Sequence, residues 1–208
     1  RAVDAFTRLL DQQVEAARKS GTQPKGELWT EGLRYTAASF ADPKWEGPMR
    51  ARVWFEKVGG RSYEPAVYQR LGDALFEQGR YPAAVEAYRL AIARAPLSPE
   101  APRLQARIVR AWARERRPEE EAEARDVLLD TYDESGDWWK RHQASPEAVK
   151  DVRESRAANL AGTAAYHHAK AQELKKAGRP ESARAEYRRA EQAYERYLRL
   201  ASGVKDAY

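Results

Sequence analysis

Residues 65–98 contain two runs of apolar residues at helical spacing, separated by a short polar loop. Gly79 lies in this loop and suits the end of a helix, because glycine readily adopts the left-handed backbone conformation found there. Pro96 follows the second run and ends it. The pattern therefore predicts a helical hairpin. Its apolar positions are Tyr68, Leu71, Leu75 and Phe76 in the first helix and Ala84, Tyr88, Ala91 and Ile92 in the second.

Residue size also varies in a regular way across this hairpin. Gly72 and Ala84 are small, which allows two helix backbones to cross closely. Tyr68, Leu75 and Tyr88 are large and suit the space beside such a crossing. We therefore expect the two helices to approach each other at Gly72 and Ala84.

The same positions resemble the tetratricopeptide repeat (TPR), a pair of antiparallel helices that stacks on copies of itself. The resemblance implies an α-helical array that binds other proteins or peptides. The matching residues are Tyr68, Leu71, Gly72, Leu75, Gly79, Tyr81, Ala84, Tyr88, Ala91 and Pro96.

Weaker copies of the pattern occur around residues 28–60, 99–132 and 146–200. The copies are unevenly spaced, and the chain begins already in helical period, as if inside the second helix of a truncated repeat. Val and Ile are too sparse and scattered to favour a sheet. We therefore predict an all-α fold, with residues 1–208 forming a single irregular right-handed TPR-like α-solenoid of antiparallel helix pairs.

The charge balance argues for a protein partner rather than a nucleic acid. The chain has 37 Lys and Arg against 32 Asp and Glu, giving a net charge of +5, and the two signs are mostly interleaved. Interleaved acids weaken attraction to a phosphate backbone, so we predict no nucleic-acid partner. No stretch approaches the roughly 18 apolar residues that a membrane-spanning helix needs. Because the sequence lacks an initiator Met, we expect a fragment, and we expect it to be monomeric.

Little in the sequence suggests catalysis. Cysteine is absent, which excludes disulfides and thiolate metal sites. The only histidines are His142, His167 and His168, and the adjacent pair lacks the i, i+4 spacing that places two metal ligands on one helical face. We predict no catalytic residues, no metal and no cofactor, and therefore a protein that is not an enzyme.

The TPR resemblance implies a binding groove, since the first helix of each TPR pair lines the concave face of the array. TPRs that clamp the carboxylate of chaperone tails use Lys and Asn there, and Gln69 and Asp73 depart from that pattern. In the last repeat the corresponding positions are basic, which suits an apolar and acidic peptide. The alternative is that these side chains only solvate a spacer. The implied groove residues are Gln69, Asp73, Phe76, His168, Gln172, Lys175 and Lys176.

Trp138 and Trp139 are adjacent, within a stretch that we interpret as a loop or short helical turn. Successive residues of a helix point in different directions, so we expect one ring to pack inward and the other to be exposed. An exposed Trp138 or Trp139 is a candidate aromatic anchor for a ligand. The alternative is that both rings wedge the loop onto the solenoid.

Several phrases, taken in order, resemble large TPR-containing envelope proteins of myxobacteria and related deltaproteobacteria, some of which are linked to gliding motility. This resemblance implies a periplasmic or outer-membrane-associated protein, with the cytoplasm as the alternative. The phrases, which together span most of the chain, are "LRYTAASFAD", "GGRSYEPAVYQRLGDALFEQGRY", "DWW", "YHHAKAQELKKAG" and "AYERYLRL".

We therefore expect a non-catalytic protein–protein interaction scaffold in a multiprotein envelope complex, serving gliding motility or envelope assembly. One alternative is a factor that binds peptidoglycan or another glycan through exposed tryptophan. A second is the helical interaction domain of a larger enzyme or regulator.

Overall fold

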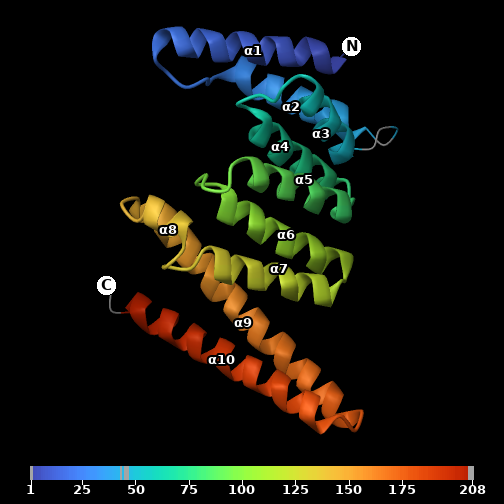
Figure 1. The fold of residues 1–208 in the computed structure, drawn as a ribbon, viewed down its shortest axis with the longest axis vertical. Coiled ribbons are helices and arrows are strands. Elements are labelled where there is room, and N and C mark those ends of the chain that lie inside the picture. Colours follow the sequence, from blue (N-terminus) through green and yellow to red (C-terminus); the bar gives the residue numbers. More distant parts are fainter. Residues whose placement is uncertain (1, 43, 45–46, 206–208) are drawn as a thin grey trace. The chain divides into compact units, whose positions relative to one another are not determined.

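The computed structural model describes the backbone of residues 2–42, 44 and 47–205, and side chains as far as Leu200. These residues form helices joined by short loops, and no strand occurs among them (Figure 1). Neighbouring helices pack in succession, which confirms the predicted all-α, TPR-like fold. The chain divides into two compact units, residues 1–96 and 97–208, where the sequence predicted one solenoid.

The described residues of the first unit form five helices. The middle helix, α3, packs on α2, α4 and α5, while α2 also packs on α1 and α4. Phe55 of α3 lies at the centre of an aromatic cluster, with its ring 5.5 Å from that of Tyr68 and 6.3 Å from that of Tyr63. The helices are α1 (Ala2–Ser20), α2 (Glu27–Ala41), α3 (Gly47–Lys57), α4 (Glu64–Glu77) and α5 (Tyr81–Arg94).

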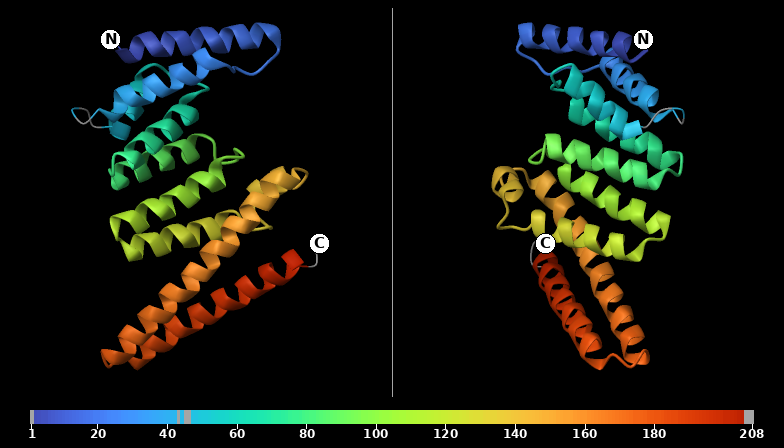
Figure 2. Two further views of the ribbon diagram at one scale, coloured as in Figure 1. Left: turned by 180° about the vertical axis from the view of Figure 1, so that it is seen from behind. Right: turned by 45° about the vertical axis from the view of Figure 1, so that its right-hand side comes forward.

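The hairpin of α4 and α5 shows why its small residues are needed. The two helices lie side by side in each view (Figures 1 and 2), and the turn between them contains Gly79 at φ +72°. A Cβ atom added to Gly72 would lie 2.5 Å from the ring of Tyr88. The Tyr88 hydroxyl donates a hydrogen bond of 2.9 Å to Asp73. The predicted close approach at Gly72 is therefore confirmed, and the large residue that fills the space is Tyr88.

Replacing Gly72 by alanine is expected to lower the opening free energy of the α4–α5 hairpin by about 1–3 kcal/mol, because the added methyl group overpacks a fully buried ring. Hydrogen exchange of the α4 and α5 amides measures this effect. The matched control is Gly162→Ala, also within a helix, where the new Cβ would meet only the movable guanidinium end of Arg125. Equal protection of the hairpin amides in Gly72→Ala and the wild type would contradict the packing argument.

The second unit is built from two hairpins and one short helix. Arg116 adopts a left-handed conformation with φ 59° and Pro118 starts the next helix, so α6 ends there and α7 begins. In the second hairpin α9 and α10 lie side by side (Figure 2). The helices are α6 (Ala101–Glu115), α7 (Pro118–Thr131), α8 (Asp137–His142), α9 (Pro146–Lys176) and α10 (Pro180–Lys205).

The core of the second unit lies where α6, α7 and α8 meet the first half of α9. Its largest members are Trp138, Trp139 and Tyr132, with Leu128, Leu129 and Leu160 beside them. Beyond this core α9 and α10 continue as a hairpin held by the small buried residues of both helices. This arrangement leaves two surfaces of α10 accessible, one beside α9 and one facing α7.

Candidate interaction groove on the C-terminal hairpin

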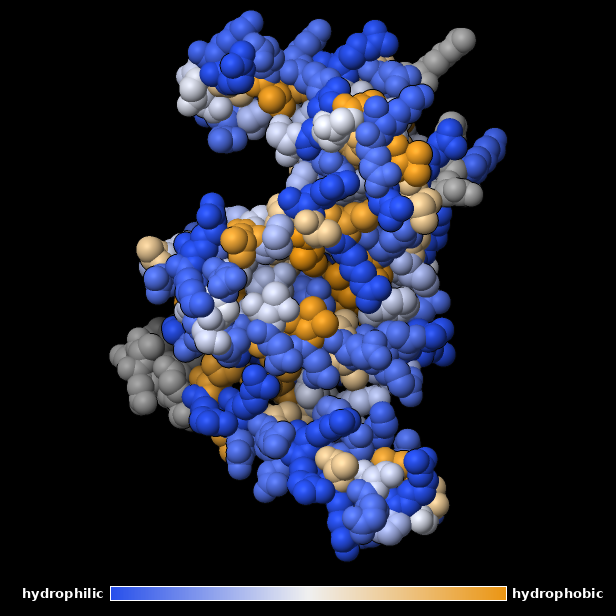
Figure 3. Space-filling view, viewed as in Figure 1, coloured by the Kyte–Doolittle hydropathy of each residue, from blue (hydrophilic) through white to orange (hydrophobic). Residues whose placement is uncertain are grey.

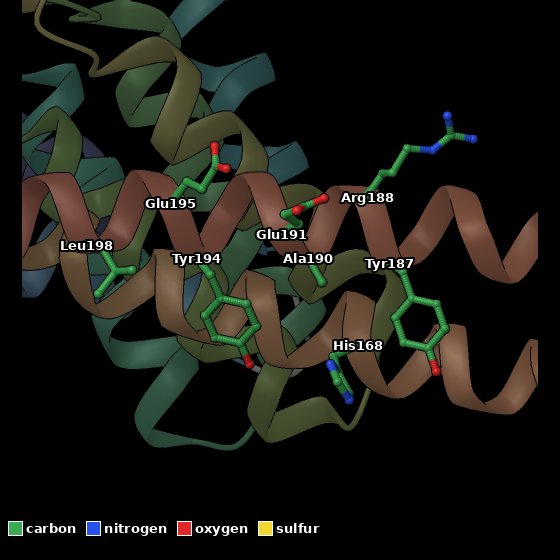
Figure 4. A pocket seen from close by; sticks show the side chains of 8 residues that line it. All are labelled: His168, Tyr187, Arg188, Ala190, Glu191, Tyr194, Glu195 and Leu198. Atoms are coloured by element: carbon green, nitrogen blue, oxygen red, sulfur yellow. The ribbon is translucent and has the colours of Figure 1, made fainter.

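A shallow groove of about 510 Å³ runs along one face of the α9–α10 hairpin. Tyr187, Tyr194 and Leu198 follow one another at helical spacing on α10, so their side chains project from the same face (Figure 4). His168 reaches the groove from α9, and its ring lies 5.6 Å from that of Tyr187 in an edge-to-face arrangement. Ala190 is small and buried, which leaves the hollow between the larger side chains.

The groove exposes large apolar side chains to solvent. Tyr194 is 44% exposed and Leu198 is 64% exposed. On the face of the molecule drawn in Figure 3, hydrophilic residues predominate and hydrophobic residues form separate small patches. Adjacent exposed aromatic and aliphatic side chains on a helix are a typical anchor for a protein partner.

Charged residues form the rim of the groove. Arg188 and Glu195 line it but point away from Tyr194 and Leu198 (Figure 4), and Glu191 lies between them on the helix. An apolar centre with a rim of mixed charge is the usual anatomy of a protein–protein interface. The arrangement can therefore bury apolar side chains of a partner while the rim orients it.

Of the groove residues implied in the last repeat, the structure places one in this groove. His168 lines it and is within 3.0 Å of the Gln172 amide, which is exposed one turn further along α9. Lys175 and Lys176 are exposed in the last turn of α9 and do not line the groove. At that position their charges stabilise the helix C-terminus. A binding role for the two lysines stays a prediction.

The three groove residues implied in the first unit are Gln69, Asp73 and Phe76. Each of them contacts another residue of the α4–α5 hairpin or is partly buried. Asp73 accepts the hydrogen bond from Tyr88, and Phe76 packs edge-to-face on Tyr81 with the ring centres 5.2 Å apart. Gln69 is half-buried, as is Phe76. Part of the surface of each side chain is thus used within the repeat, and their role in binding stays a prediction.

The expectation that one of Trp138 and Trp139 is exposed is wrong, and the alternative, that both rings wedge this stretch onto the rest of the fold, is confirmed. Trp138 is 1% exposed, and its Nε1 donates a hydrogen bond of 2.7 Å to the carbonyl of Ser98. Trp139 is 7% exposed and lies beneath the guanidinium of Arg153, 5.2 Å from the ring centre. Both rings are buried because the short helix α8 is covered on two sides. Ser98, in the loop before α6, lies on one side, and α9 lies on the other. Neither ring is available as an anchor, so a glycan-binding role loses its structural basis.

The adjacent histidines have different environments. His167 is buried, and its Nδ1 lies 2.6 Å from the Glu186 carboxylate of α10. Glu186 also accepts a hydrogen bond of 3.0 Å from Arg189. This buried contact between His167 and Glu186 joins α9 to α10 and fixes which face of each helix is exposed.

Within the part of the chain that the structure describes, no cluster of His, Asp or Glu is placed to hold a metal ion. None of the described helices is long and apolar enough to cross a membrane.

Sequence reasoning did not single out Tyr187, Tyr194 and Leu198 as a site. Their helical spacing was visible in the sequence, but such a stripe more often packs into a core. Only the structure shows that no described helix covers them.

Comparison with known proteins supports the predicted tetratricopeptide repeat but not a specific function. No curated protein matches this chain. Residues 65–98, which form α4, α5 and the turn between them, match the family model described as Tetratricopeptide repeat. The interval is the one that the sequence pattern predicted. The chain therefore contains a tetratricopeptide repeat in its first unit.

Proposed function

We propose that this chain is a non-catalytic protein–protein interaction scaffold, and that the α9–α10 groove is one of its contact surfaces. TPRs generally act as interaction modules, and the match at residues 65–98 supports this role. We choose this surface because Tyr194 and Leu198 are exposed at the centre of the groove, inside its rim of charged residues.

The groove favours a partner segment with apolar side chains. Covering Tyr194 and Leu198 removes apolar surface from water, at about 25 cal/mol per Å² buried. The charges of Arg188, Glu191 and Glu195 are of both signs, so they select the orientation of a segment rather than attract one sign. A short amphipathic helix or an extended segment satisfies both conditions.

We place this scaffold in a multiprotein complex of the cell envelope, with a role in gliding motility or envelope assembly. The support is the resemblance of several sequence phrases, taken in order, to envelope TPR proteins. Separating the cell fractions of the source organism and detecting the protein by antibody tests this placement. Recovery with periplasmic or outer-membrane fractions is expected, and recovery in the cytoplasm alone would contradict it.

Replacing Tyr194 and Leu198 together by serine is expected to weaken partner capture by about tenfold or more, because truncating a central apolar anchor costs about 2 kcal/mol. The measurement is affinity capture from lysate with quantitative mass spectrometry, followed by titration of the purified partner. Val127→Ser is the matched control, since Val127 is an exposed apolar residue on α7 outside this groove.

A Lys175→Glu, Lys176→Glu variant separates the two candidate surfaces of the hairpin. If the serine variant loses the partner and the glutamate variant keeps it, the α9–α10 groove is the site. If only the glutamate variant loses it, the basic end of α9 is the contact, and the proposed groove is wrong.

A further inference from the structure

The α9–α10 groove has a pattern that is complementary to a second copy of itself. Tyr187 and Tyr194 project from one face of α10, three residues before and four residues after Ala190 (Figure 4). When two α10 helices pack antiparallel with Ala190 of each at the centre, Tyr187 of one copy therefore lies opposite Tyr194 of the other. A twofold axis repeats this contact, because residue i meeting residue j implies that j meets i. Ala190 is small and 2% exposed, so it leaves room beside the axis for these rings.

The charges on the rim of the groove are complementary in the same arrangement. Arg188 lies midway between Glu191 and Glu195 of the second copy, two residues from being directly opposite each of them. The twofold axis forms this contact twice. Within the described part of the chain none of these three side chains forms an ion pair, whereas three other arginines of α10 do. A second copy therefore supplies the opposite charges that the rim lacks.

The α9 side of the same face does not obstruct the approach of a second copy. Ala161 and Ala165 precede His168 by seven and three residues, so they share its side of α9, and both are exposed. Because α9 and α10 run antiparallel and His168 contacts Tyr187, Ala165 lies level with Ala190. A twofold axis at this level brings Ala165 against its own copy, where the small side chain allows close packing.

The face is also large enough for a stable dimer. Helix α10 contains 26 residues and is therefore about 39 Å long. Two helices side by side are about 20 Å wide, so the face covers roughly 800 Å². This area equals the surface that one partner buries in a protein–protein interface of ordinary size.

We propose that the occupant of the α9–α10 groove is the same groove of a second copy of this chain, in a twofold-symmetric antiparallel dimer. The two hairpins then form four packed helices, with Tyr187 of each copy on Tyr194 of the other and Arg188 between the opposing glutamates. This dimer rests on the proposed function, since α10 of the second copy serves as the partner helix of that groove. It replaces the expectation of a monomer.

Sedimentation equilibrium of the full chain, from about 1 to about 200 μM, tests for the dimer. A reversible rise to twice the mass of the chain is expected. Arg188→Glu is expected to weaken self-association about tenfold or more, because the new carboxylate faces two others. The double variant Glu191→Arg, Glu195→Arg is expected to do the same. Arg196→Glu is the matched control, since Arg196 is exposed on the opposite side of α10 from Tyr194.

Mixing the Arg188→Glu variant with the Glu191→Arg, Glu195→Arg variant separates a lost contact from a damaged fold. Each copy then carries the charges that complement the other, so a heterodimer is expected where each variant alone is monomeric. A wild-type chain that stays monomeric at about 200 μM, or a mixture that does not associate, would overturn the dimer. The proposed scaffold role is judged separately, because capture of another protein through Tyr194 and Leu198 does not require self-association.

Single cysteines test the register of the dimer, since the chain has none of its own. Glu191→Cys places two thiols beside the twofold axis, so a short thiol cross-linker is expected to join the two copies. Leu198→Cys places them about 22 Å apart along the helices, so little cross-linking is expected. Equal cross-linking of the two variants, or none with Glu191→Cys, would overturn the antiparallel arrangement.

Discussion

Replacing Trp138 by alanine is expected to lower the opening free energy of the second unit by about 3–5 kcal/mol, the usual cost of removing a large aromatic side chain from a core. The ring is fully buried and packs edge-to-face on Tyr132, with the ring centres 6.0 Å apart. Its Nε1 also satisfies the Ser98 carbonyl, which connects α8 to the start of α6. Hydrogen exchange of the α6, α7 and α9 amides measures the loss.

The conservative variant Trp138→Phe separates packing from hydrogen bonding. It keeps most of the ring but removes the hydrogen bond to the Ser98 carbonyl, which still accepts one of 3.1 Å from the Ala101 amide. A smaller loss of about 0.5–1.5 kcal/mol is therefore expected. Amides of the α4–α5 hairpin in the first unit are the internal control and are expected to keep their protection. A Trp138→Ala protein with unchanged protection throughout α6 and α9 would show that the ring is not a core residue.

Replacing Asp133 by alanine is expected to destabilise the second unit by about 1–3 kcal/mol, because the buried Arg156 loses its partner, although the Asp133 side chain itself is 35% exposed. Arg156 is 4% exposed, and its Nη2 lies 2.9 Å from the Asp133 carboxylate. Its Nε has no hydrogen-bond partner among the described residues. Adding Arg156→Met to the same protein removes the stranded charge and is expected to restore much of the stability. Urea unfolding of the two variants beside the wild type measures both changes.

The contribution of Asp133 is also expected to depend on pH. Hydrogen bonds from the Ser135 amide and hydroxyl lower the pKa of Asp133 below its ordinary value of 3.8, and Arg156 lowers it further. The folded chain therefore binds the proton less readily than the unfolded chain does. The stabilisation is complete above the ordinary pKa and is lost as the pH falls through the folded pKa. The difference between wild type and Asp133→Ala should thus shrink below about pH 4, and a constant difference would contradict this account.

The hairpin at residues 65–98 was predictable because its determinants are local. Gly72 and Tyr88 belong to two helices joined by a tight turn, so their meeting follows from helical spacing and turn length alone. The weaker copies gave helix positions but not the division of the chain into two units, since that depends on contacts between residues far apart in the sequence.

The candidate sites were less predictable, because burial is decided by neighbours from other helices. Trp138 and Trp139 point in different directions on α8, but both are covered because α8 contacts other parts of the unit on two sides. His167 and His168 are adjacent, and only the register of α9 against α10 buries the first beside Glu186 and leaves the second in the groove.

By itself, the sequence determined the helical class, the absence of cysteine chemistry and the one well-formed repeat, because composition and short-range periodicity express these directly. The tertiary structure decided which apolar side chains of α10 are exposed and which of the two adjacent histidines is buried. Those outcomes depend on the angle and register at which α7, α9 and α10 pack. Helix packing of this kind is set by many weak contacts between distant residues, and no single stretch of sequence specifies it.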